Sequence, residues 1–452
     1  MNVAQVREYF IPRRSFNLHV GIKTRAWATL RRTTRARVSI TPAEISPVSE
    51  RLRLYLVLAA LTVLGPFAID MYLPGLPALA RDLHASESAS QLTLTACLIG
   101  LAVGQLIVGP LSDSLGRRPP LIVGLVGYSV ASLLCALATS IELLVAFRFL
   151  QGLAGGVGMV IATAVVRDRY TGAAAAKFFS LLMLAVMISP LFAPSIGGAL
   201  LHVTSWHGIF MALAAAGIAV TVAAWAGLPE TLGLDRRQSG GLPSALATMK
   251  RLATDRVFLS FALPACLMNG ATLAYVSGSA FVFQQVYGVS PQTYGLLFAA
   301  NGVALVVSSQ LNRALVDRFS PYGLMRFGLF LAAASGLVLL TVAVIGTHLL
   351  IALMVPLVAM IASFGFVAPN ASALALSEHG DEAGAGSALL GGLRFASGAV
   401  VAPLVGLAGP RTAVPMVVVM VALALAAAAG FIALGPRRTA DRPSETSREQ
   451  AA

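Results

Sequence analysis

The sequence predicts an all-α membrane protein with twelve transmembrane helices in two pseudo-symmetric six-helix bundles. Its 452 residues are 57% hydrophobic and only 11% charged, with a mean hydropathy of +0.81, whereas a soluble domain carries about 25% charged residues. Twelve apolar runs approach the length of about 20 residues that a bilayer-spanning helix needs. A loop motif in the first half recurs in the second half, which indicates an internal repeat.

The apolar runs fall into two sets of six. The first set lies at about 54–78, 92–111, 120–138, 143–165, 177–201 and 208–228. The second set lies at about 257–286, 293–312, 323–345, 348–369, 384–408 and 412–434. We therefore expect a disordered basic tail, a first bundle, a cytoplasmic central loop, a second bundle and a cytoplasmic tail, at 1–50, 51–228, 229–256, 257–434 and 435–452.

Basic residues alternate between successive loops, which predicts the orientation. Arginine pairs follow the second, fourth, eighth and twelfth runs, and the tail and central segment are also basic. The intervening loops at about 139–142, 202–207, 287–292 and 346–348 contain neither Lys nor Arg. The loop at about 371–383 departs from the pattern, since it is acidic. Because cytoplasmic loops carry the excess of Lys and Arg, both termini are expected to be cytoplasmic.

The loop after the second run is the most specific motif. It reads GPLSDSLGRRP, and its characteristic residues are Gly109, Asp113, Gly116, Arg117 and Arg118. The corresponding loop of the second half reads NRALVDRFSPY and contains Asp317 and Arg318, at an offset of 204. An ordinary basic turn is the alternative. The full spacing favours a gating loop whose ionic contacts form and break as the halves rock.

Two charged residues interrupt apolar runs. Asp70 lies in LTVLGPFAIDMYLPGLP and Arg148 in RFLQGLAGGVGM. A charge at bilayer depth costs about 2.5–3.5 kcal/mol on insertion scales. Both residues are expected at similar depth, so they could pair. The pair would be either a structural ion pair or a proton-titrated carboxylate beside a permanent cation.

Further polar and helix-breaking residues complete the candidate site. SPLFAPSIGG in the fifth run holds Pro190, Pro194, Gly197 and Gly198, which predicts a kinked and closely packed helix. Arg394, within GGLRFASG, is another charge in an apolar run, with no evident acidic partner. The expected substrate cavity comprises Tyr72, Gln151, Asn269, Tyr275 and Arg394.

Several function classes find no support. Residues 1–53 hold ten Arg and one Lys against three Glu, so the basic character belongs mainly to a tail and does not indicate nucleic-acid binding. The three cysteines lie in apolar runs without metal-ligand spacing. The lysines, Lys23, Lys177 and Lys250, follow Ile, Ala and Met. No Gly-Lys pair of a phosphate-binding loop is therefore present, and uphill transport would need an ion gradient.

Together these motifs resemble the major facilitator superfamily, in particular the twelve-span Bcr/CflA drug:proton antiporters. The resemblance covers about 54–434 and rests on DMYLPGLP (70–77), QLTLT (91–95), GPLSDSLGRRP (109–119), RFLQG (148–152), VVRDRY (165–170), APSIGG (193–198), LPETL (228–232) and VYGVSPQTYGLLFAANG (286–302). That group exports bicyclomycin and chloramphenicol-type antibiotics. Two residues depart from its pattern: Ser114 stands where Arg is usual, and Ala193 where Gly is common.

The resemblance implies roles for individual residues. Asp70 would be the embedded carboxylate of the first span, and Arg148 and Gln151 would belong to the fourth-span motif for proton transfer. Pro194, Gly197 and Gly198 would belong to the fifth-span antiporter motif.

The predicted function is proton-coupled efflux of small amphipathic drugs by alternating access. The chain would be a monomer in the bacterial inner membrane and would use the proton gradient, with no cofactor or metal. An importer or exporter of a small metabolite with the same fold is the alternative. A non-transporting receptor or an enzyme is disfavoured, since no catalytic constellation or large soluble domain is visible.

Overall fold

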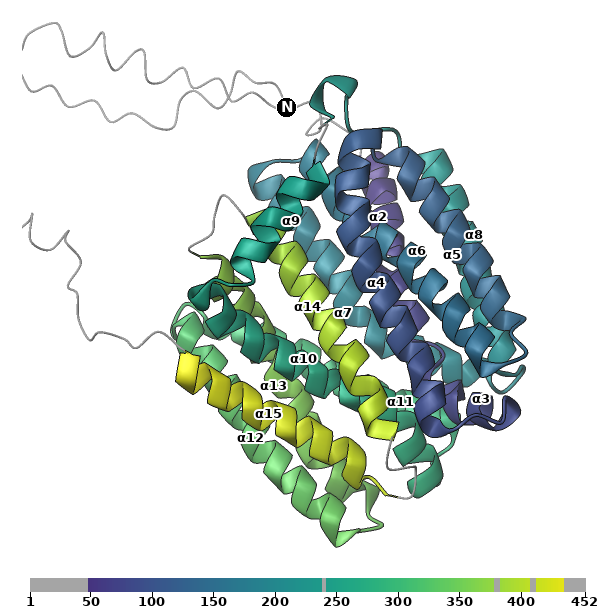
Figure 1. The fold of residues 1–452 in the computed structure, drawn as a ribbon, viewed down its shortest axis with the longest axis vertical. Coiled ribbons are helices and arrows are strands. Elements are labelled where there is room, and N and C mark those ends of the chain that lie inside the picture. Colours follow the sequence, from purple (N-terminus) through teal and green to yellow (C-terminus); the bar gives the residue numbers. More distant parts are fainter. Residues whose placement is uncertain (1–47, 238–240, 378–382, 407–411, 435–452) are drawn as a thin grey trace, which may run out of the picture. The chain divides into compact units, whose positions relative to one another are not determined.

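The computed structural model describes residues 48–237, 241–377, 383–406 and 412–434 (Figure 1). Within these ranges the chain is helical and contains no strand. Twelve of the described helices are long and apolar enough to cross a membrane, which confirms the predicted fold class. The predicted tails, 1–50 and 435–452, lie outside the described residues except for 48–50, which begin the first helix.

The membrane-spanning helices form two sets that follow one another along the chain. The first set is α2 (Val48–Asp70), α4 (Glu87–Leu115), α5 (Arg118–Ala136), α6 (Ile141–Arg169), α7 (Gly172–Leu200) and α8 (Trp206–Gly227). The second set is α10 (Arg256–Phe281), α11 (Pro291–Leu315), α12 (Pro321–Ile345), α13 (Leu350–Leu376), α14 (Ala383–Gly406) and α15 (Val414–Leu434). Most packing is within a set; between the sets, α4 packs on α14 and α7 packs on α11 (Figure 1).

The first span is broken, whereas the hydropathy pattern predicted one continuous run over 54–78. After α2 ends at Asp70, the chain forms a 3₁₀ turn, η3 (Leu73–Gly75), and a short helix, α3 (Leu76–Asp82). Pro74 and Pro77 explain the break, since each lacks the N–H that a continuing helix would need. The break exposes the last carbonyl groups of α2 to other partners.

The central segment also differs from a simple loop. It contains a 3₁₀ turn, η4 (Leu234–Arg236), and a helix, α9 (Gly241–Leu252), which contacts both α4 and α14. At its C-terminal end α10, the first helix of the second set, continues directly into a π-helical turn, η5 (Val282–Val286). With 12 residues, α9 is too short to span a bilayer, so the apolar runs of the sequence did not predict it.

The hydrogen bonds that join the two sets gather at one end of the helices. We call it the Asp82 end, and the opposite end the Arg117 end. Gln284 donates to the carbonyl of Pro74 at 2.9 Å, and Gln292 donates to that of Gly198 at 3.0 Å. The other described bonds of this kind join Ser88 to Pro403, Gln91 to Ser277, Thr95 to Ala399 and Ser195 to Gly295. The seam between the sets is therefore closed at the Asp82 end.

Glycines bring α4 and α6 into backbone contact. A Cβ atom at Gly152 would overlap the carbonyl oxygen of Cys97, and one at Gly104 would overlap that of Leu153. A Cβ at Gly156 would lie 2.9 Å from the carbonyl oxygen of Leu101. The small residues therefore set the distance between these helices, as is usual in membranes.

We predict that Gly152→Ala lowers stability, because the added methyl group forces α4 and α6 apart. Overpacking of this kind costs about 1–3 kcal/mol. Gly127→Ala is the matched control, since its Cβ would lie 3.7 Å from the Ala154 methyl group, in ordinary contact. Thermal unfolding in detergent measures both variants; equal melting temperatures would contradict the close-packing argument.

Candidate functional site

Arg148 is a fully buried cation, with 0% of its surface exposed. One terminal nitrogen donates to the carbonyl of Ala68 at 2.8 Å and also to Oε1 of Gln151. The guanidinium carbon lies 4.2 Å from the ring centroid of Tyr72 and 5.6 Å from that of Phe210. The Ala68 carbonyl belongs to the last turn of α2, where the helix dipole is negative. The charge is thus compensated by a helix end and two aromatic rings.

Two nitrogen atoms of this guanidinium, Nε and the other terminal nitrogen, are buried and have no acceptor in the part of the chain that the structure describes. A buried N–H group without a partner costs free energy. The site therefore holds donor capacity that an additional acceptor, such as a carboxylate, a water molecule or a substrate oxygen, would satisfy.

Asp70 is the last residue of α2 and is 7% exposed. The predicted pair with Arg148 is not formed in this conformation. Among the described residues Asp70 has no ion pair, whereas Arg117 pairs with both Asp113 and Asp168. The Ala68 carbonyl, two residues before Asp70, takes the guanidinium donor instead.

The predicted cavity residues divide into two groups. Tyr72 and Gln151 lie with Arg148: the Tyr72 hydroxyl bonds Thr93 at 3.3 Å, and Gln151 donates to Ser132 at 2.7 Å. The second group, Asn269, Tyr275 and Arg394, belongs to the other set of helices. Tyr72 and Gln151 are both buried in this conformation.

The second group surrounds Arg394. Its guanidinium donates to the carbonyl of Ala368 at 3.2 Å and to the hydroxyl of Ser372 at 2.9 Å. Asn269 donates to the backbone carbonyl of Arg394 at 2.8 Å. Neutral oxygen atoms on α13 therefore hold this half-buried cation, and no ion pair to it occurs within the described ranges.

Tyr275, also predicted in the cavity, faces the first set. It is buried and accepts a hydrogen bond from Asn301 at 3.1 Å. Tyr294, bonded to Ser279 at 3.0 Å, lies nearby on α11. Both tyrosine hydroxyls interact electrostatically with Asp70. Asp70 therefore lies within electrostatic range of two phenol groups of the second set of helices.

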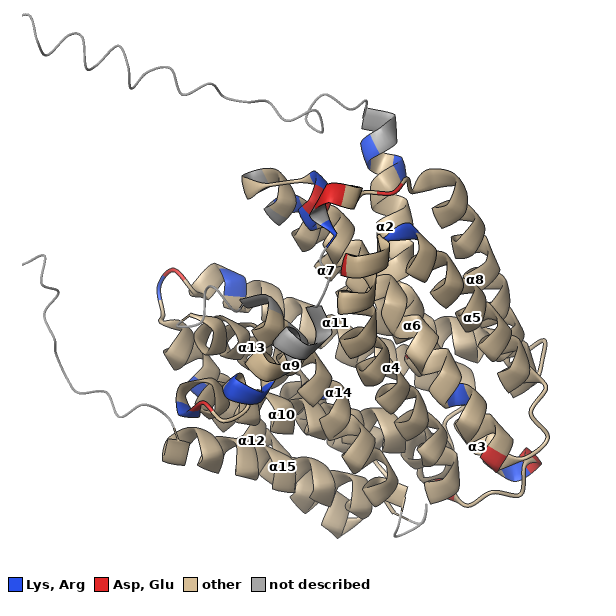
Figure 2. Cartoon of the chain, turned by 45° about the horizontal axis from the view of Figure 1, so that its top comes forward, with Lys and Arg blue, Asp and Glu red and all other residues tan. Residues whose placement is uncertain are grey.

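The loop motif forms an ionic network at the Arg117 end, where charged residues gather near the start of α2 (Figure 2). Arg117 donates to Asp113, to Ser112 at 2.8 Å and, through Nε, to Asp168 at 2.9 Å. Burial alone would lower the pKa of Arg117, but its hydrogen bonds to Asp168 and Asp113 raise the pKa above the ordinary value. Arg117 therefore stays charged.

Glu230 binds the same loop, although it lies 113 and 112 positions after Arg117 and Arg118 in the sequence. Its carboxylate accepts the backbone N–H groups of Arg117 at 2.9 Å and Arg118 at 3.1 Å, which belong to the start of α5, where a negative charge is favourable. A Cβ at Gly116 would lie 2.6 Å from this carboxylate, and φ is +94° there. Gly116 is thus required both by space and by its backbone conformation.

The pKa of Glu230 follows from these contacts. Partial burial would raise it, but hydrogen bonds from the backbone of Leu232, Arg117, Arg118 and Thr231 lower it by more. The pKa of Glu230 therefore lies below its ordinary value.

Other predicted loop residues have weaker roles in this structure. A Cβ at Gly109 would lie 4.0 Å from Val160, so packing does not require glycine there. Asp317 and Arg318 are exposed at the end of α11. No side-chain hydrogen bond or ion pair joins them to another residue that the structure describes.

The fifth-span motif lies at the seam. Pro190 and Pro194 are inside α7. A Cβ at Gly197 would overlap the carbonyl of Met71, next to Asp70, and one at Gly198 would lie 2.7 Å from the carbonyl of Pro291 on α11. The motif therefore brings α7 against both the broken first span and the second set of helices.

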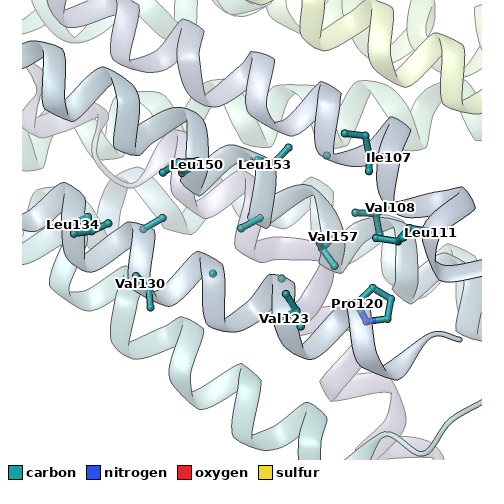
Figure 3. A pocket seen from close by; sticks show the side chains of 15 residues that line it. Ile107, Val108, Leu111, Pro120, Val123, Val130, Leu134, Leu150, Leu153 and Val157 are labelled. Atoms are coloured by element: carbon teal, nitrogen blue, oxygen red, sulfur yellow. The ribbon is translucent and has the colours of Figure 1, made fainter. Parts of the chain in front are cut away.

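An apolar groove of about 470 Å³ lies elsewhere, between α4, α5 and α6 (Figure 3). Its lining includes Ile107, Val123, Val130, Leu150 and Val157, of which Val123 is 73% exposed. No lining side chain offers a hydrogen bond or a charge. The groove therefore lies apart from the polar site and presents a surface that suits lipid.

The sequence prediction missed Asp168 and Glu230 as partners of the loop motif. Both stand in quoted motifs, VVRDRY and LPETL. The acidic residue between two arginines and the acidic residue after a helix-ending proline were the available signals.

Two sets of six spanning helices, a seam between them and buried charges beside the seam define a multi-pass membrane transporter. The chain belongs to the major facilitator superfamily, whose family model, Major Facilitator Superfamily, matches residues 58–403.

Relatives and solved structures agree with this membership. "Uncharacterized MFS-type transporter YdgK" of Bacillus subtilis is 41% identical over 86% of this chain and 97% of its own length. "Bicyclomycin resistance protein homolog" of Haemophilus influenzae is 30% identical over 86% of this chain and 97% of its own length. "Multidrug resistance protein MdtL" of Salmonella typhimurium is 35% identical over 61% of this chain and 69% of its own length.

Two solved transporters share the fold. A bacterial homologue of the human lysosomal transporter Spinster, in an inward-facing and occupied conformation, has a TM-score of 0.70 at 17% identity, over 86% of this chain and 97% of that one. A D-xylose–proton symporter has a TM-score of 0.64 at 16% identity, over 84% and 97%.

We predict that Asp168→Asn destabilises the protein more than Asp113→Asn. The Asp168 side chain is 10% exposed and the Asp113 side chain 44%, so the first ion pair is less screened by solvent. Removing one partner of a buried pair costs several kcal/mol, whereas an exposed pair contributes about 0–1 kcal/mol. Thermal unfolding measures the two losses, and equal losses would show that burial does not distinguish the two contacts.

We also predict that the stabilising effect of Glu230 depends on pH. Since folding lowers its pKa, the contribution is present above the ordinary pKa of about 4.3 and is lost as pH falls through the folded value. Glu230→Gln should therefore lower the melting temperature at pH 7, and the deficit should persist to about pH 4 and shrink as the pH falls further. Ser114→Ala, which changes the same loop without a titratable group, should give a constant difference; a constant Glu230→Gln deficit would refute the assignment.

Proposed function

We propose that this transporter exports small amphipathic drugs across the bacterial inner membrane in exchange for protons. The Arg117 end and both termini would be cytoplasmic, because the basic loops gather at that end. The Asp82 end would then face outward. The closed seam at the Asp82 end corresponds in this proposal to an inward-facing conformation.

One observation carries the proposal: Asp70 is a buried carboxylate that ends α2, has no ion pair with any residue the structure describes, and interacts electrostatically with Tyr275 of the second set of helices. A carboxylate whose negative charge is not fixed by a cation can gain or lose a proton without breaking a salt bridge. Intramembrane carboxylates of this kind are typical of proton pathways.

Arg148 supplies the second part of the mechanism. Its unpartnered N–H groups lie beside the end of α2, two residues from Asp70. A small movement of α2 would offer them the Asp70 carboxylate and stabilise its ionised form. A return to the Ala68 carbonyl would favour the neutral form, so rocking of the two sets would load and release the proton.

The proton motive force supplies the work. One charge crossing 100 mV releases about 2.3 kcal/mol, which corresponds to roughly a fifty-fold concentration ratio, and a pH gradient adds to it. No cofactor enters this scheme.

Relatives suggest the substrate class. The names of two relatives refer to bicyclomycin resistance and multidrug resistance. The polar residues near the seam mix phenol, amide and guanidinium groups with aromatic rings, which suits amphipathic molecules with hydrogen-bonding groups.

We predict that Asp70→Asn abolishes proton release when drug is added to the purified protein, while drug binding remains and loses its pH dependence. Asparagine keeps the size and hydrogen bonding of the side chain but cannot titrate. Glu142→Gln, at an exposed carboxylate of α6, is the control and should release protons as the wild type does. Unchanged proton release from Asp70→Asn would show that Asp70 is structural.

The purified protein, reconstituted into vesicles, also distinguishes drug export from transport of a small metabolite. Reconstituted vesicles with an imposed proton gradient should accumulate drug on the acidic side. Uptake of a sugar or another metabolite together with protons, and no drug movement, would favour a symporter instead.

A further inference from the structure

A second carboxylate, Glu87, lies at the seam, at the start of α4. It is the first residue of that helix, and Ser86 caps the helix by accepting the N–H of Ala89 at 3.1 Å. Oε1 of Glu87 accepts a hydrogen bond from Gln91 at 3.4 Å, whereas Oε2 is buried and has no partner within the described ranges. An orphaned carboxylate oxygen at a site that closes the protein is unusual and requires an explanation.

Gln91 connects this carboxylate to the opposite set of helices. It is fully buried, and its amide also donates to the carbonyl of Ser277 on α10 at 3.3 Å. A Cβ at Gly406 would lie 2.5 Å from Oε1 of Gln91, so the amide also packs on α14. Glu87, Gln91 and Ser277 thus form a chain of contacts across the seam.

A cavity of about 350 Å³ gives Glu87 a path to solvent at the Asp82 end. Arg81 and His84 line it from the first set, and Phe281 and Gln285 line it from the second. Among the described residues that line this cavity, the titratable or charged groups are Arg81, His84 and Glu87. The lining residues from α10 and η5, Phe281 and Gln285, are neutral.

We propose that Glu87 is a proton-operated latch of the outer gate: the closed seam holds it neutral, and its ionisation opens the seam. An ionised Oε2 that is buried and has no partner among the described residues is costly in the closed state, whereas an open seam hydrates it. The closed state therefore binds a proton at Glu87 more tightly than the open state does. By linkage, external acidity favours closure by the same factor.

The latch acts on conformation and carries no transported proton. Protons outside the cell would close the outer gate after a drug has left, which commits the transporter to return inward. This inference rests on the alternating access and orientation proposed above. Its readout is the accessibility of the seam. The latch can therefore be refuted while Asp70 still couples transport to protons, and coupling at Asp70 can be refuted while the latch stands.

The test measures how fast the seam opens. Thr95 is buried and its hydroxyl donates across the seam to the carbonyl of Ala399 at 3.2 Å, so a Thr95→Cys thiol reacts only when the seam opens. Cys97, Cys135 and Cys266 are replaced by Ser, and a membrane-impermeant maleimide is applied outside intact cells. Rates are divided by those of Val203→Cys, 83% exposed at the same end, which removes the pH dependence of the maleimide reaction.

The normalised rate should fall at least about five-fold from pH 8 to pH 6, within the usual range of coupling factors. In Glu87→Gln it should be low and independent of pH, because glutamine mimics the neutral carboxyl group. Glu142→Gln, an exposed carboxylate outside the seam, should keep the wild-type dependence.

Two further variants separate Glu87 from its neighbour. His84 has φ +49°, a conformation that asparagine tolerates, so His84→Asn removes the imidazole without straining the turn and should keep the pH dependence. Glu87→Asp still titrates and should keep it too. The proposal is overturned if Glu87→Gln retains the wild-type pH dependence, if Glu87→Asp loses it, or if His84→Asn abolishes it.

Discussion

The cation of Arg148, buried among bilayer-spanning helices, constrains the structure around it. A charge at this depth needs partners within the protein, because no water is present to solvate it. The protein supplies them by ending α2 at Asp70, which frees the Ala68 carbonyl as an acceptor. The face of Tyr72, in the turn that follows, lies 4.2 Å from the guanidinium carbon. One break in the first span therefore satisfies a charge that an unbroken helix would leave without an acceptor.

The same break also builds the seam between the two sets of helices. The turn after Asp70 places the Met71 carbonyl against Gly197 of α7, where no side chain fits. Three residues further on, the Pro74 carbonyl accepts a hydrogen bond from Gln284 of η5 in the second set. The segment that holds the buried charges is thus continuous with the segment that closes the gate. A movement at either place is transmitted through a few residues of backbone, without a long pathway of side chains.

Sequence patterns predicted what depends on composition and local spacing: the twelve spans, the loop motif and the placement of Asp70 and Arg148 as charges within the spanning region. They did not predict partners. Arg117 meets Asp168 and Glu230 from 51 and 113 positions away, a distance that only tertiary packing closes. Likewise, similar depth suggested that Asp70 and Arg148 pair, but depth does not say which acceptor the guanidinium prefers. The break after Asp70 was marked by Pro74 and Pro77, which hydropathy does not weigh.

The helices repeat between the halves, but their chemistry does not. In the first half, Arg117 is fixed by two carboxylates, whereas Asp317 and Arg318 are exposed at the corresponding loop. In the second half, the cation Arg394 is held by the Ala368 carbonyl and the Ser372 hydroxyl. Across the seam, Asp70 interacts electrostatically with the neutral phenols of Tyr275 and Tyr294. In the proposed transport cycle, such neutral groups could move past a carboxylate in either protonation state without breaking an ion pair. The asymmetry would then keep the proposed charge change on one half and leave the other half free to move against it.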